Sequence, residues 1–209
     1  MQVSRQQVAG QAKKGPSART RRLMLETATR LMQAGKTPSV SEVAEAAEVS
    51  RATAYRYFPS QAALVHAVVD EALGPILDWQ SSSQDVESRV EDLIGTSMPR
   101  IIEFEATFRA ALKLSLEPEA ATGSAENREP RFTRGHRVDL LRDAVRPLAG
   151  TLPPEDAERL AQALSLFYGI EMLVVLKDIW GLDDKAAVSV IDWAAQSLVR
   201  AAIAAKASK

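Results

Sequence analysis

The sequence contains no cysteine and only two histidines, His66 and His136, among its 209 residues. Without cysteine the chain can form no disulfide and has no thiolate metal ligand or cysteine nucleophile. The two histidines lie far apart in the sequence, so a zinc site built on paired imidazoles is not expected. The sequence therefore predicts no metal and no other cofactor.

Strand patterns, a leader segment and long uncharged stretches are also missing. No segment shows the alternation of apolar and polar residues that is typical of a strand, and the N-terminus lacks the apolar core of a signal peptide. No stretch of about 18 residues, the shortest that indicates a membrane span, is free of charge. We therefore expect an all-α, soluble, cytoplasmic protein without a membrane partner, long enough for one large or two small domains.

Charge is distributed unevenly along the chain. Residues 1–58 contain ten Lys and Arg against four Asp and Glu, whereas residues 59–209 contain sixteen against twenty-three. A basic N-terminal part on an acidic body indicates a polyanionic partner for the N-terminal part alone. A solvated basic tail is the alternative, but Arg51 and Arg56 fall within a predicted helix.

Residues 39–58 hold two short helix patterns separated by a tight corner. Ser39 and Glu42 form the S-x-x-E capping box that starts a helix. An apolar stripe follows at helical spacing, made by Val40, Val43, Ala44 and Ala47. Ser50 can cap the second helix, which carries polar and aromatic side chains that cannot all face a core: Arg51, Thr53, Tyr55, Arg56 and Tyr57. This arrangement predicts a helix-turn-helix for the major groove of DNA.

The side chains of the second helix differ in what they can recognise on DNA. We expect Arg51 and Thr53 to read base edges, because arginine can pair with guanine through two hydrogen bonds and threonine can donate or contact a thymine methyl. Tyr55, Arg56 and Tyr57 are expected to contact phosphates and sugars, with packing against the first helix as the alternative for each tyrosine. The DNA-binding candidates also include capping, anchoring and small residues: Ser39, Ser41, Ser50, Ala52 and Gln61.

Three parts of the chain can be predicted. Residues 1–16 are polar, lack periodicity and are interpreted as a disordered basic arm. Residues 17–63 form the helix-turn-helix domain and residues 64–209 a helical body, with about nine helices in all. Residues 118–130, rich in Pro, Glu, Ala, Gly and Ser, are expected to be a disordered loop.

The last two predicted helices, residues 154–180 and 183–205, are each apolar on two sides. A helix of this kind needs two surfaces to bury against, one in its own domain and one in a partner. We therefore expect a homodimer. The residues expected at its interface are Leu166, Ile170, Leu173, Val188, Ile191, Ala195, Leu198 and Ala202.

The N-terminal motif resembles that of the TetR family of bacterial transcriptional regulators. The family pattern appears, over about residues 17–68, as Val40, Val43-Ala44, Ala47-Glu48-Val49-Ser50, Thr53, Tyr55, Tyr57-Phe58 and Leu64. Glu48 stands where the family usually has glycine, so the corner either avoids a positive φ or is strained there. Gln61 replaces a lysine that contacts a DNA phosphate in family members, so an uncharged and weaker contact is expected.

The resemblance also implies a ligand pocket between the middle helices of the body. Candidates to line it are aromatic, titratable or sulfur-containing: Trp79, Phe104, Phe108, His136, Phe167, Tyr168, Glu171 and Met172. Core packing is the alternative for each aromatic residue. Glu171 interrupts an apolar helix face, and a buried carboxylate needs a partner, either a ligand or a residue across the dimer.

By resemblance, the chain is expected to be a ligand-responsive repressor that binds a palindromic operator in double-stranded DNA as a dimer and is released by a small molecule. One alternative is a DNA-binding regulator without an effector, which predicts a filled body with no cavity. Another is an all-helical enzyme. The sequence has no nucleophile elbow, phosphate loop or metal cluster, so catalytic activity is not expected.

Overall fold

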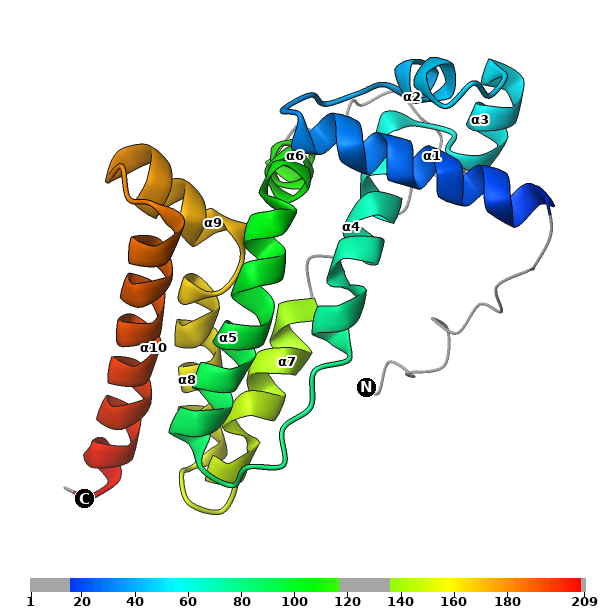
Figure 1. Cartoon of the computed structure of the whole chain (residues 1–209). Coiled ribbons are helices and arrows are strands. Elements are labelled where there is room, and N and C mark those ends of the chain that lie inside the picture. The colour runs from blue at the N-terminus through cyan, green and yellow to red at the C-terminus, as the bar shows by residue number, and fades with distance from the viewer. Residues whose placement is uncertain (1–15, 117–135, 208–209) are drawn as a thin grey trace. The chain divides into compact units, whose positions relative to one another are not determined.

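The computed structural model describes residues 16–116 and 136–207, and within these ranges the chain is all-α, as the sequence predicts (Figure 1). The described residues form ten α-helices, together with short 3-10 and π-helical segments and an isolated β-bridge. The helices are α1 (Pro16–Gln33), α2 (Val40–Ala46), α3 (Arg51–Tyr57), α4 (Gln61–Leu77), α5 (Val86–Glu103), α6 (Glu105–Leu116), α7 (His136–Val145), α8 (Pro154–Leu164), α9 (Ile170–Leu173) and α10 (Asp184–Ala207). The predicted 118–130 loop and the predicted N-terminal arm, apart from Pro16, lie outside the described residues.

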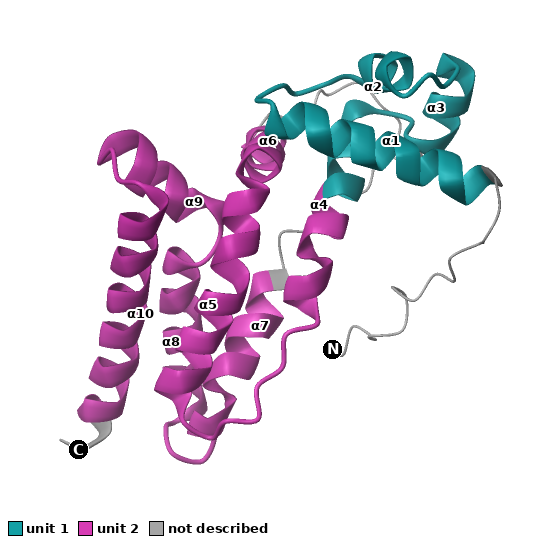
Figure 2. Cartoon of the chain, in the orientation of Figure 1, with its two compact units in different colours: residues 1–68 teal, residues 69–209 magenta. Residues whose placement is uncertain are grey.

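Two compact units divide the chain, residues 1–68 and residues 69–209 (Figure 2). The division falls within α4. The boundary expected from the sequence, between residues 63 and 64, lies in the same helix. One helix therefore contributes residues to both units.

The core of the first unit is built from one apolar face of each of its helices. The buried apolar side chains of α1 to α4 in this unit are Met24, Leu25, Ala28, Met32, Val40, Val43, Ala44, Ala54, Leu64, Val65 and Val68. Phe58, which follows α3, is also buried. The chain leaves α1 through Gly35, whose φ of 79° is the left-handed conformation that commonly ends helices.

The corner between α2 and α3 places Glu48 in a conformation that side chains rarely adopt. Its φ is 53°, the only positive φ of a non-glycine residue in the described ranges. The backbone N–H of Val49 donates to the carbonyl of Ala44 at 2.8 Å, which closes the turn. Of the two possibilities raised by the missing glycine, the strained one is found, at a cost of about 1–2 kcal/mol.

In the second unit, α5 packs against α6, α7 and α10, α8 packs against α7 and α10, and α6 packs against α9. Pro99 lies inside α5, which continues to Glu103. A proline in a helix removes one hydrogen bond, here the bond to the carbonyl of Gly95, and the helix tolerates this loss. The chain turns at Phe104, before α6 begins.

The helix expected over residues 154–180 is interrupted, so this prediction is wrong in its middle. α8 is followed by a 3-10 turn, Ser165–Phe167, and then by Tyr168 in an extended conformation. Gly169 has φ 126° and ψ −167°, which no helix contains, and α9 begins only at Ile170. An isolated glycine can be tolerated within a helix, so the presence of Gly169 in the sequence did not predict the break.

The side of α10 that was expected at the dimer interface is partly buried within the single chain. Ile191 and Ala195, expected at the dimer interface, are each 1 % exposed within a single chain. Leu173 and Ile170 are likewise buried. These four residues fill the chain's own core and offer little or no surface to a second copy. Leu166, Val188, Leu198 and Ala202 keep some exposed surface.

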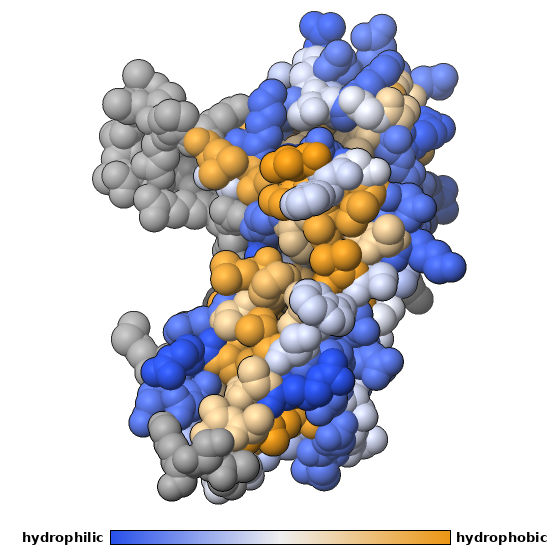
Figure 3. All heavy atoms as spheres, turned by 90° about the vertical axis from the view of Figure 1, so that its left-hand side faces the viewer, coloured by the Kyte–Doolittle hydropathy of each residue, from blue (hydrophilic) through white to orange (hydrophobic). Residues whose placement is uncertain are grey.

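Large apolar side chains are instead exposed along the C-terminal part of the second unit. They are Leu166, Val175, Ile179, Trp180, Val190, Trp193 and Ile203, here called the C-terminal apolar surface. Figure 3 views the molecule from the side on which α10 lies and shows apolar side chains gathered along it. Trp180 and Trp193 are 73 % and 68 % exposed, which is unusual for single tryptophans.

Residues Asp184–Ala205 of α10 are long and apolar enough to cross a membrane by length and composition alone. The same segment packs Ile191, Ala195 and Val199 into the chain's core and carries Asp192 on a half-buried position. Two apolar faces, one buried and one exposed, account for its composition.

Candidate DNA-binding surface and ligand cavity

The third helix presents one solvent-exposed face. Arg51, Ala52, Tyr55 and Arg56 are exposed, whereas Ala54 is fully buried. The exposed positions recur at a spacing of four residues, so they lie side by side along one side of α3. Two arginines and a tyrosine with small Ala52 among them can approach a groove and donate hydrogen bonds there.

Hydroxyl caps fix where α2 and α3 begin. The backbone N–H of Ser39 donates to Glu42 Oε2 at 2.7 Å, and the N–H of Glu42 donates to Ser39 Oγ at 3.2 Å, which completes the predicted capping box. Ser50 accepts from the backbone N–H of Thr53 at 3.3 Å, and its hydroxyl donates to Thr53 Oγ1 at 2.9 Å. These bonds hold Thr53, near the start of α3, in a fixed orientation.

Each tyrosine of α3 shares a hydrogen bond with a serine of another helix. The hydroxyls of Tyr55 and Ser41 are 3.3 Å apart, and the Tyr57 hydroxyl donates to Ser17 Oγ at 2.9 Å. Tyr55 remains 45 % exposed, whereas Tyr57 is half-buried. Tyr57 therefore joins α3 to the start of α1, and Tyr55 keeps an exposed ring.

Gln61 is engaged within the protein. Its side-chain amide nitrogen donates to the carbonyls of Thr37 and Pro38 at 3.0 and 3.1 Å. An amide has two N–H donors, so both are used here. The side chain fixes the loop between α1 and α2, and donation to a DNA phosphate would require it to give up one of these bonds.

An apolar cavity of about 90 Å³ lies within the second unit. It is lined by α4, α5, α6, α7 and the break before α9, through Val69, Leu73, Ile76, Ile101, Phe108, Ala111, Leu112, Arg137, Leu140, Tyr168, Gly169, Ile170 and Glu171. Of the residues expected to line a pocket, Phe108, Tyr168 and Glu171 do so. Trp79, Phe104, Phe167 and Met172 do not. His136 begins α7, but its side chain lies outside what the structure describes.

Two of the remaining candidates are held by arginines elsewhere in the unit. The indole N–H of Trp79 donates to Asp92 Oδ2 at 2.8 Å, and Arg89 lies 5.5 Å from its ring centroid. Arg100 lies 4.1 Å from the ring centroid of Phe104. Met172 is buried and Phe167 is half-buried away from the cavity. For Trp79 and Phe104, core packing is the better description.

The polar end of the cavity is an ion pair, of which the sequence analysis predicted only Glu171. Arg137 Nη2 donates to Glu171 Oε1 at 2.8 Å and to Oε2 at 3.0 Å, and Nη1 donates to the carbonyl of Tyr168 at 2.9 Å. Glu171 was expected to be buried and to meet a ligand or a residue across the dimer; its side chain is instead 35 % exposed and pairs with an arginine of the same chain. Arg137 was not foreseen, because nothing in the local pattern of α7 marks it as facing a cavity.

Gly169 allows this ion pair to lie against the backbone. A Cβ at this position would fall 2.8 Å from Glu171 Oε2 and 3.0 Å from Arg137 Cζ. The first approach is closer than real side chains show and the second is tight, so the ion pair would have to shift, and the φ of 126° is itself a conformation for glycine. The break in the helix and the ion pair are therefore parts of one local structure.

Tyr168 forms part of the cavity wall and is locked by a buried hydrogen bond. Its hydroxyl donates to Ser97 Oγ at 2.7 Å. Burial raises the pKa of Tyr168 to about 12, because the phenolate would lose its hydration, while the bond to Ser97 and the charge of Arg137 oppose this shift. The cavity wall therefore holds a neutral phenol at physiological pH.

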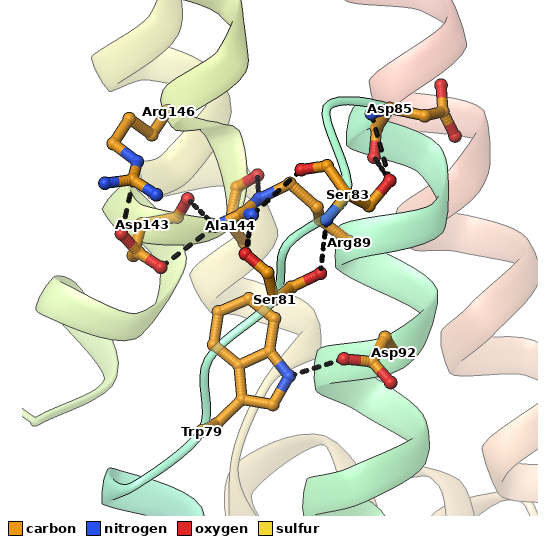
Figure 4. A network of polar contacts seen from close by, with 9 residues as sticks. All are labelled: Trp79, Ser81, Ser83, Asp85, Arg89, Asp92, Asp143, Ala144 and Arg146. Carbon is orange, nitrogen blue, oxygen red and sulfur yellow. Dashed lines mark hydrogen bonds and ion pairs between the residues drawn. The ribbon is translucent and has the colours of Figure 1, made fainter.

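A buried arginine ties the segment after α4 to α5 and α7 (Figure 4). Arg89 is 1 % exposed and donates from Nε to Ala144 O, from Nη1 to Ser81 O and Ser83 O, and from Nη2 to Asp143 O and Oδ2, at 2.5–3.1 Å. All five guanidinium N–H groups are thus satisfied. Arg89 is a charged residue on the otherwise largely apolar inner face of α5. This interruption is visible in the sequence and could have identified Arg89 as a buried, hydrogen-bonded residue.

Ion pairs also hold the π-helical segment η4 (Val174–Ile179) that leads to α10. Arg109 makes two hydrogen bonds to Asp178, at 2.6 and 2.8 Å, and one to Glu105 at 2.8 Å. Lys177 bridges Glu105 and Asp184. The bond to Arg109 lowers the pKa of Asp178, and the bonds to Asp184 and Glu105 raise the pKa of Lys177. This network positions the exposed side chains that follow it.

In residues 16–116 and 136–207, no three His, Asp or Glu side chains are grouped as a metal ion would require. The candidate functional features of the described residues are the exposed face of α3, the cavity and the C-terminal apolar surface.

Comparison with known proteins gives matches for both units. The family model for bacterial regulatory proteins of the tetR family matches residues 24–68. No curated protein sequence matches the chain. A TetR transcriptional regulator from Rhodococcus sp. RHA1 superimposes with a TM-score of 0.57 at 22% identity, over 86% of this chain and 96% of that one. A tetR-family transcriptional regulator from Streptomyces coelicolor superimposes with a TM-score of 0.62 at 19% identity, over 91% and 82%. At these identities the two structures support the fold.

Proposed function

Because the chain belongs to the TetR family of bacterial transcriptional regulators, we propose that it is a ligand-responsive repressor that acts in the cytoplasm and binds a palindromic DNA operator as a homodimer. The observation that carries this proposal is the exposed face of α3. There Arg51, Tyr55 and Arg56 lie on a short helix whose start is capped by Ser50 and whose opposite side is buried.

DNA recognition is assigned to this face. Arg51 and Thr53, at the start of α3, are proposed to contact base edges, since recognition helices read bases with their N-terminal residues. Tyr55 and Arg56 are proposed to contact phosphates and sugars, which fix the register. Ser39, Ser41, Ser50, Ala52 and Tyr57 complete the surface. Gln61 is assigned to positioning the loop that precedes α2, given its bonds to that loop.

Dimerisation is assigned to the C-terminal apolar surface. Exposed tryptophan and isoleucine side chains on one region of a soluble regulator mark an interaction site, and a two-fold axis allows the same surface on two copies to bury itself. Two α3 helices related in this way would fit successive major grooves, about 34–36 Å apart. The operator is therefore expected to be a palindrome.

Ligand release is assigned to α4. Residues Val69, Leu73 and Ile76 of this helix line the cavity, and its first residues belong to the unit that carries α3. A ligand that favours one position of α4 would change the affinity for the operator by the same factor as DNA changes the affinity for the ligand. The presence of a cavity favours an effector-binding regulator over one without an effector.

Selection of bound duplexes from a random DNA pool tests this proposal. The full chain is expected to enrich a palindromic sequence with half-site centres about one helical turn apart, or a multiple of this spacing. Enrichment of no sequence, or of single unpaired half-sites, would contradict the proposed dimeric operator binding.

A further inference from the structure

The cavity is small and apolar except at one end. Its volume is about 90 Å³, and apolar cavities take small apolar molecules. Side chains such as Leu73, Ile101 and Leu140 form most of the wall. Size and lining together favour a compact, largely apolar ligand no larger than about one ring.

At the polar end, the charges of Arg137 and Glu171 offset each other. Arg137 and Glu171 are bonded to each other at 2.8 Å and are 25 % and 35 % exposed, so they lie where the apolar cavity meets solvent. A carboxylate ligand would bind Arg137 only by facing Glu171, and an ammonium ligand would meet Arg137 in the same way. Either ligand would break the pair and leave one charge without its partner beside an apolar wall.

An uncharged polar group avoids this conflict. A hydroxyl can donate to a carboxylate oxygen that already accepts from arginine, because each carboxylate has about four acceptor positions. A carbonyl can likewise accept from the guanidinium edge. Neither contact requires the pair to separate. Because Gly169 has no side chain, the Arg137–Glu171 pair can lie against the backbone. The fold therefore fixes the position of the pair.

We propose that this cavity binds an uncharged, largely apolar molecule of about one ring that carries a single hydroxyl or carbonyl group, and that the Arg137–Glu171 pair rejects charged analogues. The inference rests on the proposed function, since it names the effector class for the same cavity.

Three probes of nearly equal size test the selectivity: benzyl alcohol, benzoate and benzylamine. Their binding to the full chain without DNA is measured at pH 7 by calorimetry and by ligand-observed NMR. Benzyl alcohol is expected to bind at least tenfold more tightly than either charged probe. Equal or tighter binding of benzoate or benzylamine would overturn the proposal, as would the failure of all three to bind.

Charge variants test whether the ion pair is the cause. Glu171→Gln leaves Arg137 without its carboxylate and is expected to tighten benzoate binding at least tenfold. Arg137→Gln leaves Glu171 and is expected to tighten benzylamine binding by a similar factor. The double variant is neutral again and should keep the preference for benzyl alcohol. Because the single variants shift selectivity in opposite directions, partial unfolding cannot produce both results. An unchanged order of the probes in both variants would contradict the role of the pair.

Failure of this inference is distinguishable from failure of the proposed function. A chain that selects a palindromic duplex but binds no probe contradicts only the effector class. A chain that binds benzyl alcohol selectively but enriches no DNA contradicts only the proposed regulation of an operator.

Discussion

Arg137 and Glu171 meet directly over the α-carbon of Gly169, with 2.8 Å between Nη2 of the arginine and Oε1 of the glutamate. The contact joins α7 to the start of α9. Between residues 154 and 180, where one continuous helix was predicted, Gly169 is the only described residue with a positive φ. The ion pair therefore lies both at the interruption of the helix and at the polar end of the cavity, where it is proposed to reject charged ligands.

Replacement of Gly169 by alanine is expected to destabilise the chain. The positive φ would be strained, and the added methyl would displace the ion pair, for a total loss of about 1–3 kcal/mol in the free energy of unfolding. Urea unfolding followed by circular dichroism measures this. Gly95→Ala is the control: Gly95 lies within α5 with no atom near its added Cβ, so this variant should be neutral or more stable. A loss for Gly95→Ala as large as that for Gly169→Ala would contradict the account.

Removal of the Arg89 side chain is expected to be more damaging. Arg89→Met would leave four backbone carbonyls without their donor and leave Asp143 with only its ion pair to Arg146, at a cost of about 3–5 kcal/mol. Thermal and urea unfolding measure the loss. Arg159→Met is the control, because its pair with Asp156 is largely exposed and such pairs contribute about 0–1 kcal/mol. Similar stabilities for the two variants would show that the Arg89 network adds little.

The C-terminal apolar surface should determine the oligomeric state. Trp193→Glu and Trp180→Glu are expected to give folded monomers in sedimentation velocity, since they place charge on exposed residues of the proposed interface. Ile191→Glu should instead lower stability by about 3 kcal/mol or more, because it buries a charge in the core. Lys113→Glu, on exposed α6 surface, should leave a dimer. Dimers that persist in both tryptophan variants would refute this assignment.

Tyr168 gives the cavity wall a measurable pH dependence. Because burial raises its pKa from the usual 10 to about 12, the folded state favours the protonated phenol. This contribution to stability, up to about 3 kcal/mol, is fully present below pH 10 and is lost as the pH rises towards 12. The difference in tyrosinate absorbance between the native chain and Tyr168→Phe should have its midpoint near pH 12. A midpoint near pH 10 would mean that the hydroxyl is solvated.

The sequence was sufficient to predict the all-α class, the capping box at Ser39 and the buried stripe of α2, because these depend on short-range spacing and local hydrogen bonds. It placed the α3 candidates on one helix, and the structure places Arg51, Tyr55 and Arg56 on its exposed side.

Other features depend on which of two similar apolar helix faces packs into the core. The two apolar sides of α10 have similar composition, so spacing alone could not tell that Ile191 faces inward and Trp193 outward. Arg137 and Glu171 are far apart in the sequence and meet only through the packing of α7 against the segment before α9. The break at Gly169 lies at the same place, and a single glycine in a helical pattern is not enough to predict it.

Operator binding by Arg51→Ala tests the central claim most directly. Fluorescence anisotropy compares the native chain, Arg51→Ala and the control Arg30→Ala, an exposed arginine at the end of α1, on a selected operator and on a scrambled duplex of equal length. We expect Arg51→Ala to lose about 1–3 kcal/mol of affinity on the operator and much less on the scrambled duplex, while Arg30→Ala affects both duplexes equally. Equal losses of Arg51→Ala on the two duplexes, or no loss on either, would contradict base recognition by α3.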